Sequence, residues 1–318
     1  MKKTVVGIDI GGTNIDIAFV DKKGEILLRS HHATNEYPQF QDFVKALAEE
    51  IKYLKSKNNI DVIAIGIGAP NGNYYNGTIE YAPNLEWKGI VQVVKMIENE
   101  INIPAFITND ANAAAMGEML YGGAKGLQDF VYITLGTGVG SGIVVNGRLV
   151  YGHDGFAGEI GHTIVEENGR LCGCGRKGCL ETYSSVSGLI RSVLLLKSQY
   201  PESILNNYDK NDITGKIIYE AAVKGDSLAL HAFDIAVKKL GLALANVSAI
   251  TSPHTIFLFG GLAKAKEFIF KPVKNNMEKN LLNVFRDKIE LKPSLLADNE
   301  AAIKGAAALA WNEILNTK

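Results

Sequence analysis

All three cysteines of this 318-residue chain lie within eight positions of one another, and a histidine precedes them. Cys172, Cys174 and Cys179 follow His162, which stands ten residues ahead of the first cysteine. A Cys-x-Cys pair is too close for an unstrained mutual disulfide, and an odd count leaves one thiol unpaired. Three thiolates and one imidazole instead supply the ligands of a closed tetrahedral zinc site. Three small apolar side chains in a surface loop are the weaker explanation.

Two carboxylates, Glu159 and Glu181, stand immediately outside this set of ligands. A metal ion that draws the ends of the segment together would place both carboxylates near one point. Glycines in the CGCG and KGC stretches supply the tight turns that such closely spaced ligands require. Because four protein ligands leave zinc no open coordination position, we expect a structural zinc. It would hold a loop whose polar groups face a ligand.

Three glycine-rich turns follow apolar stretches, and together they predict a phosphate or nucleotide site. In DIGGTN, the amides of Gly11 and Gly12 and the Thr13 hydroxyl can donate to phosphate oxygens, and Asp9 can orient the water shell of Mg²⁺. A simple hairpin is the alternative for this turn taken alone. The second turn, LGTGVGSG, lacks the Lys-Ser/Thr ending of a P-loop and precedes an expected strand, which makes Walker and Rossmann sites poor interpretations. In the third, FGGLAKAKEF, a glycine pair precedes an expected helix, whose N-terminus suits an anion.

Asn109 and Asp110 stand where an apolar strand meets an alanine-rich helix, in TNDANAAAMGE. Taken alone, Asp110 is a good N-cap for that helix. The alanines, however, indicate that the helix packs closely against a neighbour, and strand ends that open onto a cleft carry the chemistry of α/β proteins. Asn84, in YAPNLEW, is a further polar loop residue, although an amide there is more often a turn residue than a ligand.

The composition is that of an ordinary globular protein. At 34.4 kDa the chain exceeds the size at which a single core usually stops growing, so we expect two domains. The net charge of −1 gives no electrostatic reason to expect nucleic-acid binding. No apolar stretch approaches the roughly 18 residues that span a bilayer, and the first apolar run meets Asp9 too early for a signal peptide. Clustered thiols without a disulfide framework indicate the cytoplasm.

Strands and helices alternate along the chain, which predicts an α/β protein. Two strand–glycine-turn–strand units indicate a duplicated architecture. The predicted strands are 4–10, 15–21, 25–33, 62–68, 104–108, 130–135, 143–145 and 255–259, and the predicted helices are 40–54, 111–120, 227–250 and 299–311. We expect a small N-terminal α/β domain of residues 1–115, completed by a C-terminal helix at 299–318. A large α/β domain of residues 116–298 would carry the zinc-binding loop.

Together these motifs resemble the ROK family (repressor, ORF, kinase) of sugar kinases, within the actin-like ATPase superfamily. The match spans the chain, through DIGGTN, TNDANAAAMGE, LGTGVGSG, AGEIGH, CGCGRKGCLE, FGG and AAIKGAAAL. The Glu-x-Gly-His ahead of the cysteines makes it specific. The resemblance implies two ribonuclease-H-like domains flanking a cleft, in which ATP phosphorylates a hexose hydroxyl.

The resemblance also implies roles for individual residues. The catalytic base would be Asp110, which accepts the proton of the attacking hydroxyl. The sugar contacts would be Asn84, Asn109, Asp110, Glu159, His162 and Glu181, and the zinc ligands would be His162, Cys172, Cys174 and Cys179. The ATP phosphates would meet Gly11, Gly12, Thr13 and Thr137, with Gly138 close by, and Gly260 and Gly261 would hold the nucleoside. Two positions depart from the family pattern, Asn14 where many members have lysine and Leu262 where many have glycine, and the second leaves the nucleoside contacts open.

These features predict an ATP-dependent kinase that phosphorylates the 6-hydroxyl of glucose, with Asp110 as general base and Mg-ATP as donor. A kinase for N-acetylmannosamine or N-acetylglucosamine is the alternative, because Glu159, His162 and Glu181 recognise ring hydroxyls and do not report on the C2 substituent. The family also includes sugar-sensing repressors. Since their DNA-binding helices precede the kinase-like part, the strand expected from Thr4 leaves no room for them here. An actin-like ATPase that moves a partner protein has no use for the zinc segment.

The expected partners are a small sugar and ATP, without nucleic acid or membrane. A homodimer or homotetramer is expected from the resemblance alone, because nothing in the composition decides the oligomeric state.

Overall fold

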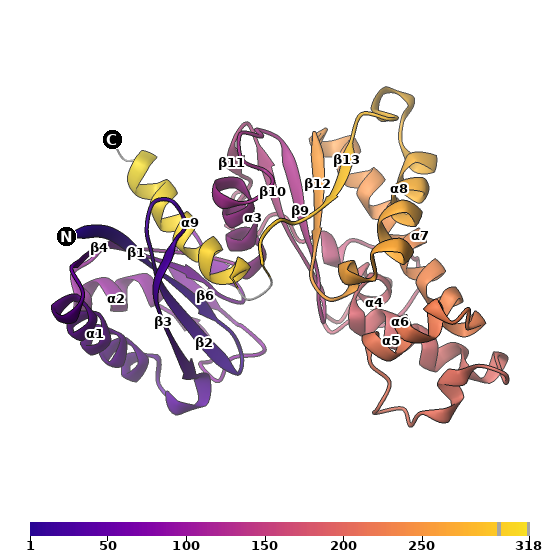
Figure 1. Ribbon diagram of the computed structural model, residues 1–318, viewed down its shortest axis with the longest axis horizontal. Helices are drawn as coiled ribbons and strands as arrows, with labels where there is room; N and C mark the ends of the chain where they lie inside the picture. Colours follow the sequence, from indigo (N-terminus) through magenta and orange to yellow (C-terminus); the bar gives the residue numbers. More distant parts are fainter. Residues whose placement is uncertain (298–299, 317–318) are drawn as a thin grey trace.

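The computed structural model describes residues 1–297 and 300–316, and two five-stranded mixed sheets form its framework (Figure 1). The first sheet has the strand order β3-β2-β1-β4-β8, and the second has the order β11-β10-β9-β12-β13. In both, the strand on which the sheet is centred pairs antiparallel with the strand that follows it and parallel with a later one. The predicted duplication is therefore confirmed.

The strands have the following bounds. The first sheet contains β1 (Lys2–Ile10), β2 (Asn14–Val20), β3 (Ile26–Ala33), β4 (Ile60–Gly68) and β8 (Ala105–Thr108). The second contains β9 (Phe130–Leu135), β10 (Val139–Val145), β11 (Arg148–Leu149), β12 (Thr255–Phe259) and β13 (Glu290–Pro293). A small third sheet joins β5 (Gly72–Asn73), β6 (Thr78–Glu80) and β7 (Ile90–Val91).

Helices cover both faces of each large sheet (Figure 1). The α-helices are α1 (Phe40–Lys57), α2 (Val93–Ile101), α3 (Asp110–Tyr121), α4 (Glu181–Ser184), α5 (Val186–Leu196), α6 (Gly215–Val223), α7 (Ser227–Thr251), α8 (Lys266–Asn280) and α9 (Ala301–Asn316). Short 3₁₀ turns are η1 (Thr34–Glu36), η2 (Ile160–His162), η3 (Lys197–Gln199), η4 (Ile204–Asn207), η5 (Leu262–Ala265) and η6 (Asn283–Phe285). None of the helices in the described part of the chain is long and apolar enough to cross a membrane.

The hydrophobic core is divided by the sheets into separate layers. On one face of the first sheet, apolar side chains pack against α1 and α2, and on the other face they pack against α9. The second sheet has its largest core on the side of α5 to α8, and a smaller aromatic layer lies between it and α3. Each sheet thus forms the middle layer of its own three-layer α/β/α unit, as a duplicated α/β architecture requires.

The helices α3 and α9 cross between the two sheets, and glycine and alanine let them approach closely. A Cβ added at Gly117 in α3 would lie 3.0 Å from the Cα of Gly305 in α9. On its other side α3 meets β10, where a Cβ at Gly142 would lie 2.5 Å from that of Ala115. The close packing expected from the alanines of α3 is therefore confirmed.

A loop contact also joins the two halves of the molecule. Asn73 Nδ2 donates to the carbonyl of Asp154 at 2.9 Å, and the rings of Tyr74 and Tyr151 stack with centroids 4.1 Å apart. The first residue of each pair belongs to the β5–β6 region and the second to the loop that leads to Glu159. The loop before Glu159 is consequently anchored on the first half of the molecule.

Most predicted elements are confirmed within a few residues, and the differences have local causes. The second glycine turn is shorter than expected, since β10 already begins at Val139 and includes Gly140 and Gly142. These glycines lie in a strand because α3 leaves no room there for side chains. The closing helix begins at Ala301 and continues past the predicted end at Trp311. Positions 298, 299, 317 and 318 of the predicted boundary and C-terminal helix lie outside the described residues.

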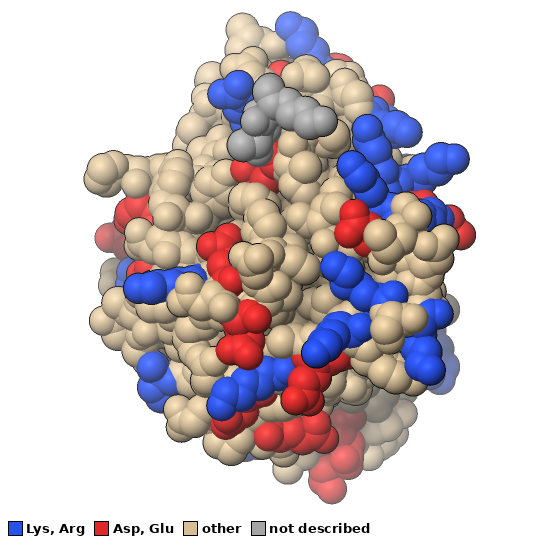
Figure 2. All heavy atoms as spheres, turned by 90° about the vertical axis from the view of Figure 1, so that its left-hand side faces the viewer, with Lys and Arg blue, Asp and Glu red and all other residues tan. Residues whose placement is uncertain are grey.

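Charged side chains of both signs are interspersed on the surface. On the face shown in Figure 2, acidic and basic residues alternate and neither sign covers it. The presence of both signs agrees with the near-zero net charge of the chain.

Candidate active site and metal centre

The four predicted metal ligands come together at one point. One ligand atom from each of His162, Cys172, Cys174 and Cys179 lies within 4.8 Å of all the others. The Sγ atoms of Cys174 and Cys179 are 3.6 Å apart, and Cys172 Sγ lies 3.7 Å from His162 Nδ1. Ligands about 2.3 Å and 2.0 Å from a tetrahedral zinc have separations of this size. The donor set and its geometry therefore fit zinc, and all three cysteines are free of disulfides.

A short hairpin holds the cysteines in this arrangement. Ile164 pairs with Cys179 and Leu171 pairs with Lys177 as isolated antiparallel bridges. Gly178 has a φ of +83°, and a Cβ there would overlap the carbonyl oxygen of Glu166, so this position requires glycine. The turns expected from the CGCG and KGC stretches are confirmed at Gly175 and Gly178.

The three thiols have different environments in the metal-free protein. Backbone donation from Arg176 lowers the pKa of Cys174 to about 6, whereas burial raises the pKa of Cys172. Cys172 Sγ donates to Glu181 Oε1 at 2.9 Å, and the same oxygen lies 3.8 Å from His162 Nδ1. Glu181 is thereby placed directly against two of the metal ligands.

Asp110 lies at the first turn of α3, but it is not the cap of that helix. The N-cap is Asn109, whose side chain accepts from the amide of Asn112 at 2.7 Å. The capping role considered for Asp110 is wrong because β8 ends at Thr108 and leaves Asn109 in the extended conformation that a cap adopts. The Asp110 carboxylate accepts from the amide of Ala111 at 2.8 Å, through Oδ1.

The carboxyl of Asp110 lies where neighbouring residues shield it from water. Its residue surface is exposed, yet the surrounding protein desolvates the carboxyl and raises its pKa. Asp9 lies close by, since a Cβ added at Gly68 would stand 3.9 Å from both Asp9 Oδ1 and the Cα of Asp110. Desolvation first, and then the charges of Asp110 and Asp16, raise the pKa of Asp9 to about 7. Glu159 also has a raised pKa, from burial first, while the nearby His162 lowers it and the charges of Asp110 and Glu181 raise it. The fold thus brings together acidic residues from both halves.

The first glycine turn lies against the loop that contains Asn84. A Cβ at Gly12 would stand 2.5 Å from the carbonyl oxygen of Asn84. The turn is closed by donation from the Gly11 amide to the Asn14 carbonyl at 2.8 Å, and Thr13 accepts from the Thr34 amide at 2.9 Å. Because Gly12, Thr13 and Asn84 are exposed, their polar groups are open to a ligand.

The second glycine turn lies against the metal loop. A Cβ at Gly138 would stand 2.8 Å from Glu181 Oε2, and the Gly136 carbonyl accepts from the Val186 amide at 2.8 Å. Thr137, between these glycines, is exposed. The residues predicted to hold phosphate and those predicted to hold sugar are therefore neighbours.

Gly261, the second residue of the third glycine pair, lines a largely apolar cavity of about 410 Å³. Gly260 has a φ of +97°, and its Cβ would collide with the backbone of Leu135, so the turn after β12 requires glycine. Leu262, which replaces the family's third glycine, is buried at the edge of this cavity. The cavity is lined by Val186, Leu189, Gly215, Lys216, Tyr219, Phe233, Gly261, Leu262, Lys264 and Ala265.

Sequence patterns do not single out the side chains that line this cavity from α5, α6 and α7. Leu189, Tyr219 and Phe233 occur at helical spacing among other apolar residues, which indicates a core and not a binding surface. In the sequence, only the glycine pair before Leu262 indicates that a ligand could bind in this region.

Comparison with known proteins agrees with this geometry. The model of the ROK family matches residues 5–313. The glucokinase of Halalkalibacterium halodurans is 37% identical over 307 residues, which cover 94% of this chain and 93% of that protein.

Solved structures give the same result. A ROK family glucokinase from Streptomyces griseus, in complex with glucose and AMPPNP, superposes with a TM-score of 0.78 at 33% identity, covering 97% of this chain and 99% of that one. The ROK hexokinase from Thermus thermophilus gives a TM-score of 0.84 at 28% identity, over 98% and 99% of the two chains. The predicted actin-like, two-domain fold is confirmed. The chain belongs to the ROK family.

Proposed function

We propose that this protein is an ATP-dependent glucokinase that transfers the γ-phosphoryl group of ATP to the 6-hydroxyl of glucose. The observation that carries the proposal is the contact between Glu181 and Gly138, which joins the sugar-recognition loop to a phosphate turn. Phosphoryl transfer depends on placing acceptor and donor in line and neutralising charge, more than on a strong base. Relatives named glucokinase support the choice of reaction.

Asp110 acts as the general base in this proposal. Its carboxylate orients the attacking hydroxyl and takes its proton as the new P–O bond forms. The bond between the γ-phosphorus and the bridging oxygen breaks in the same step, and ADP leaves. A raised pKa suits this role, because it brings the group closer to the pH at which a base both is ionised and accepts a proton readily. The remaining sugar contacts are assigned to Asn84, Asn109, Glu159, His162 and Glu181.

ATP is assigned to the two glycine turns and the apolar cavity. The amides around Gly11, Gly12 and Gly138, with the hydroxyls of Thr13 and Thr137, surround the phosphates as anion-binding nests do. Gly260 and Gly261 hold the nucleoside at the rim of the cavity. Asp9 would hold the water shell of Mg²⁺, and the ion would supply positive charge that neutralises the phosphates.

Zinc has a structural role in the proposal. With His162, Cys172, Cys174 and Cys179 as ligands, no coordination position is left for a substrate. His162 is fixed between Glu159 and Glu181, so the metal holds three sugar contacts in one arrangement.

The packing of α3 and α9 supports a domain division close to the one expected from the sequence. We assign α9 to the small domain, because it packs on β1, β2 and β4. The contacts of α3 with β9 and β10 favour a boundary just before Asp110, a few residues ahead of position 115. Limited proteolysis that cuts near residues 122–129 and leaves both sheets intact would argue against this placement.

Two further assignments accompany the proposal. A homodimer or homotetramer is expected from the family, and light scattering of the purified protein decides between them. The cytoplasm is expected because it supplies ATP and keeps the free cysteines reduced.

A coupled assay with Mg-ATP tests the function across glucose, mannose, fructose, N-acetylmannosamine and N-acetylglucosamine. The highest kcat/KM is expected with glucose. A preference for an N-acetylhexosamine would show that the pocket accepts a larger C2 substituent. Tight sugar binding without turnover would instead identify a sugar-sensing regulator and overturn the proposed activity.

A further inference from the structure

Arg170, two residues before the first metal-ligating cysteine, extends its side chain away from the metal loop into the helices behind it. Its guanidinium Nη1 donates to the carbonyls of Thr182 at 2.7 Å and Gly188 at 3.1 Å, and Nη2 donates to Ser192 Oγ at 2.9 Å. The guanidinium carbon also lies 4.4 Å from the ring centroid of Tyr183. One side chain therefore connects the metal loop to both α4 and α5.

The helix α4 needs such contacts because it is only four residues long. A helix of one turn has no stability of its own, and its carbonyls lack partners within the helix. Ser185 Oγ donates to the Glu181 carbonyl at 2.7 Å, and Arg170 donates to the next one, that of Thr182. Arg170 and the cap of α5 together supply the hydrogen bonds that α4 cannot make.

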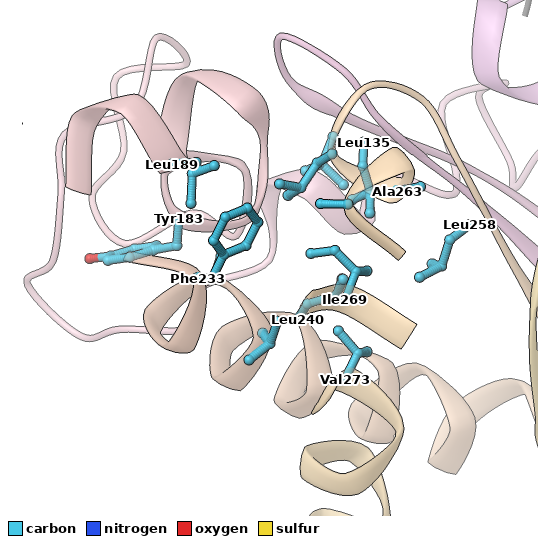
Figure 3. Packing of buried hydrophobic residues seen from close by; sticks show 14 of the residues in the cluster. Leu135, Tyr183, Leu189, Phe233, Leu240, Leu258, Ala263, Ile269 and Val273 are labelled. Atoms are coloured by element: carbon cyan, nitrogen blue, oxygen red, sulfur yellow. The ribbon is translucent and has the colours of Figure 1, made fainter. Parts of the chain in front are cut away.

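The two helices that Arg170 joins lie beside the regions assigned to the two substrates of the proposed reaction. Glu181, the first residue of α4, lies against Cys172 and Gly138. On the other side, Val186 and Leu189 of α5 line the apolar cavity assigned to the nucleoside. Figure 3 shows Tyr183, Leu189 and Phe233 in the same group of buried apolar side chains, and Phe233 also lines that cavity.

We propose that Arg170 is a positioning residue that fixes α4 relative to α5. It thereby holds the Glu181 carboxylate where the sugar would bind, and it keeps the lining of the nucleoside cavity in place. The inference rests on the proposed function. Its chemistry is specific to a guanidinium, because three acceptors in different directions are satisfied at once. Lysine retains the charge but has a single nitrogen, which cannot reach all three.

The variant Arg170→Lys tests the inference, with Arg191→Lys as a matched control. Arg191 lies on α5 and donates to the Leu171 carbonyl at 2.7 Å, but this interaction leaves α4 untouched. Calorimetric titration of glucose onto the zinc-loaded proteins should give an affinity about tenfold weaker in Arg170→Lys, the size expected from losing charge-assisted hydrogen bonds. The KM for ATP should rise about threefold, kcat should change less, and Arg191→Lys should stay within about twofold of the parent.

Two measurements make the test independent of catalysis. Zinc content should remain at one ion per chain in Arg170→Lys, and the amides of residues 181–189 should exchange with deuterium faster than in the parent protein without sugar. Unchanged exchange would overturn the inference, as would equal effects of the two lysine variants or loss of zinc from Arg170→Lys. A parent protein that phosphorylates no sugar would contradict the proposed function, while the exchange experiment still decides the role of Arg170.

Discussion

The two halves of the molecule repeat one sheet topology, but they carry different residues at equivalent positions near the end of the central strand. Asp9 is the last but one residue of β1, and Thr134 is the last but one residue of β9. The Thr134 hydroxyl accepts from the amide of Gly140 within its own hairpin at 3.0 Å. Among the described residues, the Asp9 carboxylate has no hydrogen-bond partner, and its pKa is raised to about 7.

This difference indicates how a duplicated fold comes to have one active site. In the second half, the polar group at the strand end is satisfied internally and stabilises the turn. In the first half, a desolvated carboxylate remains free, which is costly unless a cation compensates it. The chemistry is therefore expected where Asp9, at the end of β1 in the first half, meets Asp110, at the start of α3 between the two halves. The metal loop and the nucleoside cavity of the second half are proposed to supply recognition.

The largest effect is expected from Asp110→Asn. Loss of the proposed general base should lower kcat by about 10²–10⁴-fold. The glucose dissociation constant should change by less than about threefold, because the amide retains the shape of the side chain. Steady-state kinetics and calorimetry on the same preparation check this. An Asp110→Asn protein with parental turnover would remove Asp110 from the chemistry.

The paired variants Asp9→Asn and Thr134→Val test the comparison of the two halves directly. Asp9→Asn should lower kcat by about 100-fold and raise the Mg²⁺ concentration required for half-maximal rate, because the carboxylate that binds the ion's water shell is lost. Thr134→Val removes a turn hydrogen bond and should cost about 1 kcal/mol of stability, with kcat nearly unchanged. Equal losses of turnover in the two variants would show that both halves contribute to catalysis.

Removal of the metal should affect recognition more than the chemical step. Treatment with a zinc chelator is expected to raise the KM for glucose about tenfold, since His162 and Glu181 lose the loop that fixes them, and kcat at saturating sugar should fall less. Circular dichroism establishes that the chelated protein is folded, and added zinc should restore the KM. Loss of kcat at unchanged sugar affinity would identify a catalytic metal.

The smallest expected effect is a pH-dependent contribution of Asp9 to the stability of the fold. Because folding raises the pKa of Asp9 from 3.8 to about 7, the folded state holds this proton more tightly than the unfolded state. The contribution of Asp9 to stability is therefore greatest below about pH 4 and is lost as the pH rises toward about 7. In Mg²⁺-free buffer, the Tm of Asp9→Asn should fall less between about pH 5 and pH 8 than that of the parent, by differential scanning calorimetry. The opposite trend would show that the Asp9 carboxylate is compensated.

Much of the framework could be predicted from the sequence, because its signals are local. Apolar runs before glycine turns identify β1, β9 and β12, and the cysteine spacing identifies the metal centre. The cap at Asn109 could not be assigned, since both Asn109 and Asp110 suit a cap and the choice depends on where β8 ends. The cavity lining from α5 to α7 and the contacts of Arg170 depend on packing between segments far apart in the chain, which leaves no pattern in any one of them.

The crossing of α3 and α9 bears on movement. Helices that interlock through large side chains must repack when they rotate, whereas Gly117 and Gly305 meet almost backbone to backbone. The crossing can therefore act as a hinge. One half can rotate about it relative to the other while few side chains change their rotamers. Asp110 is the first residue of α3, so the proposed base belongs to one of the two helices that meet at this crossing.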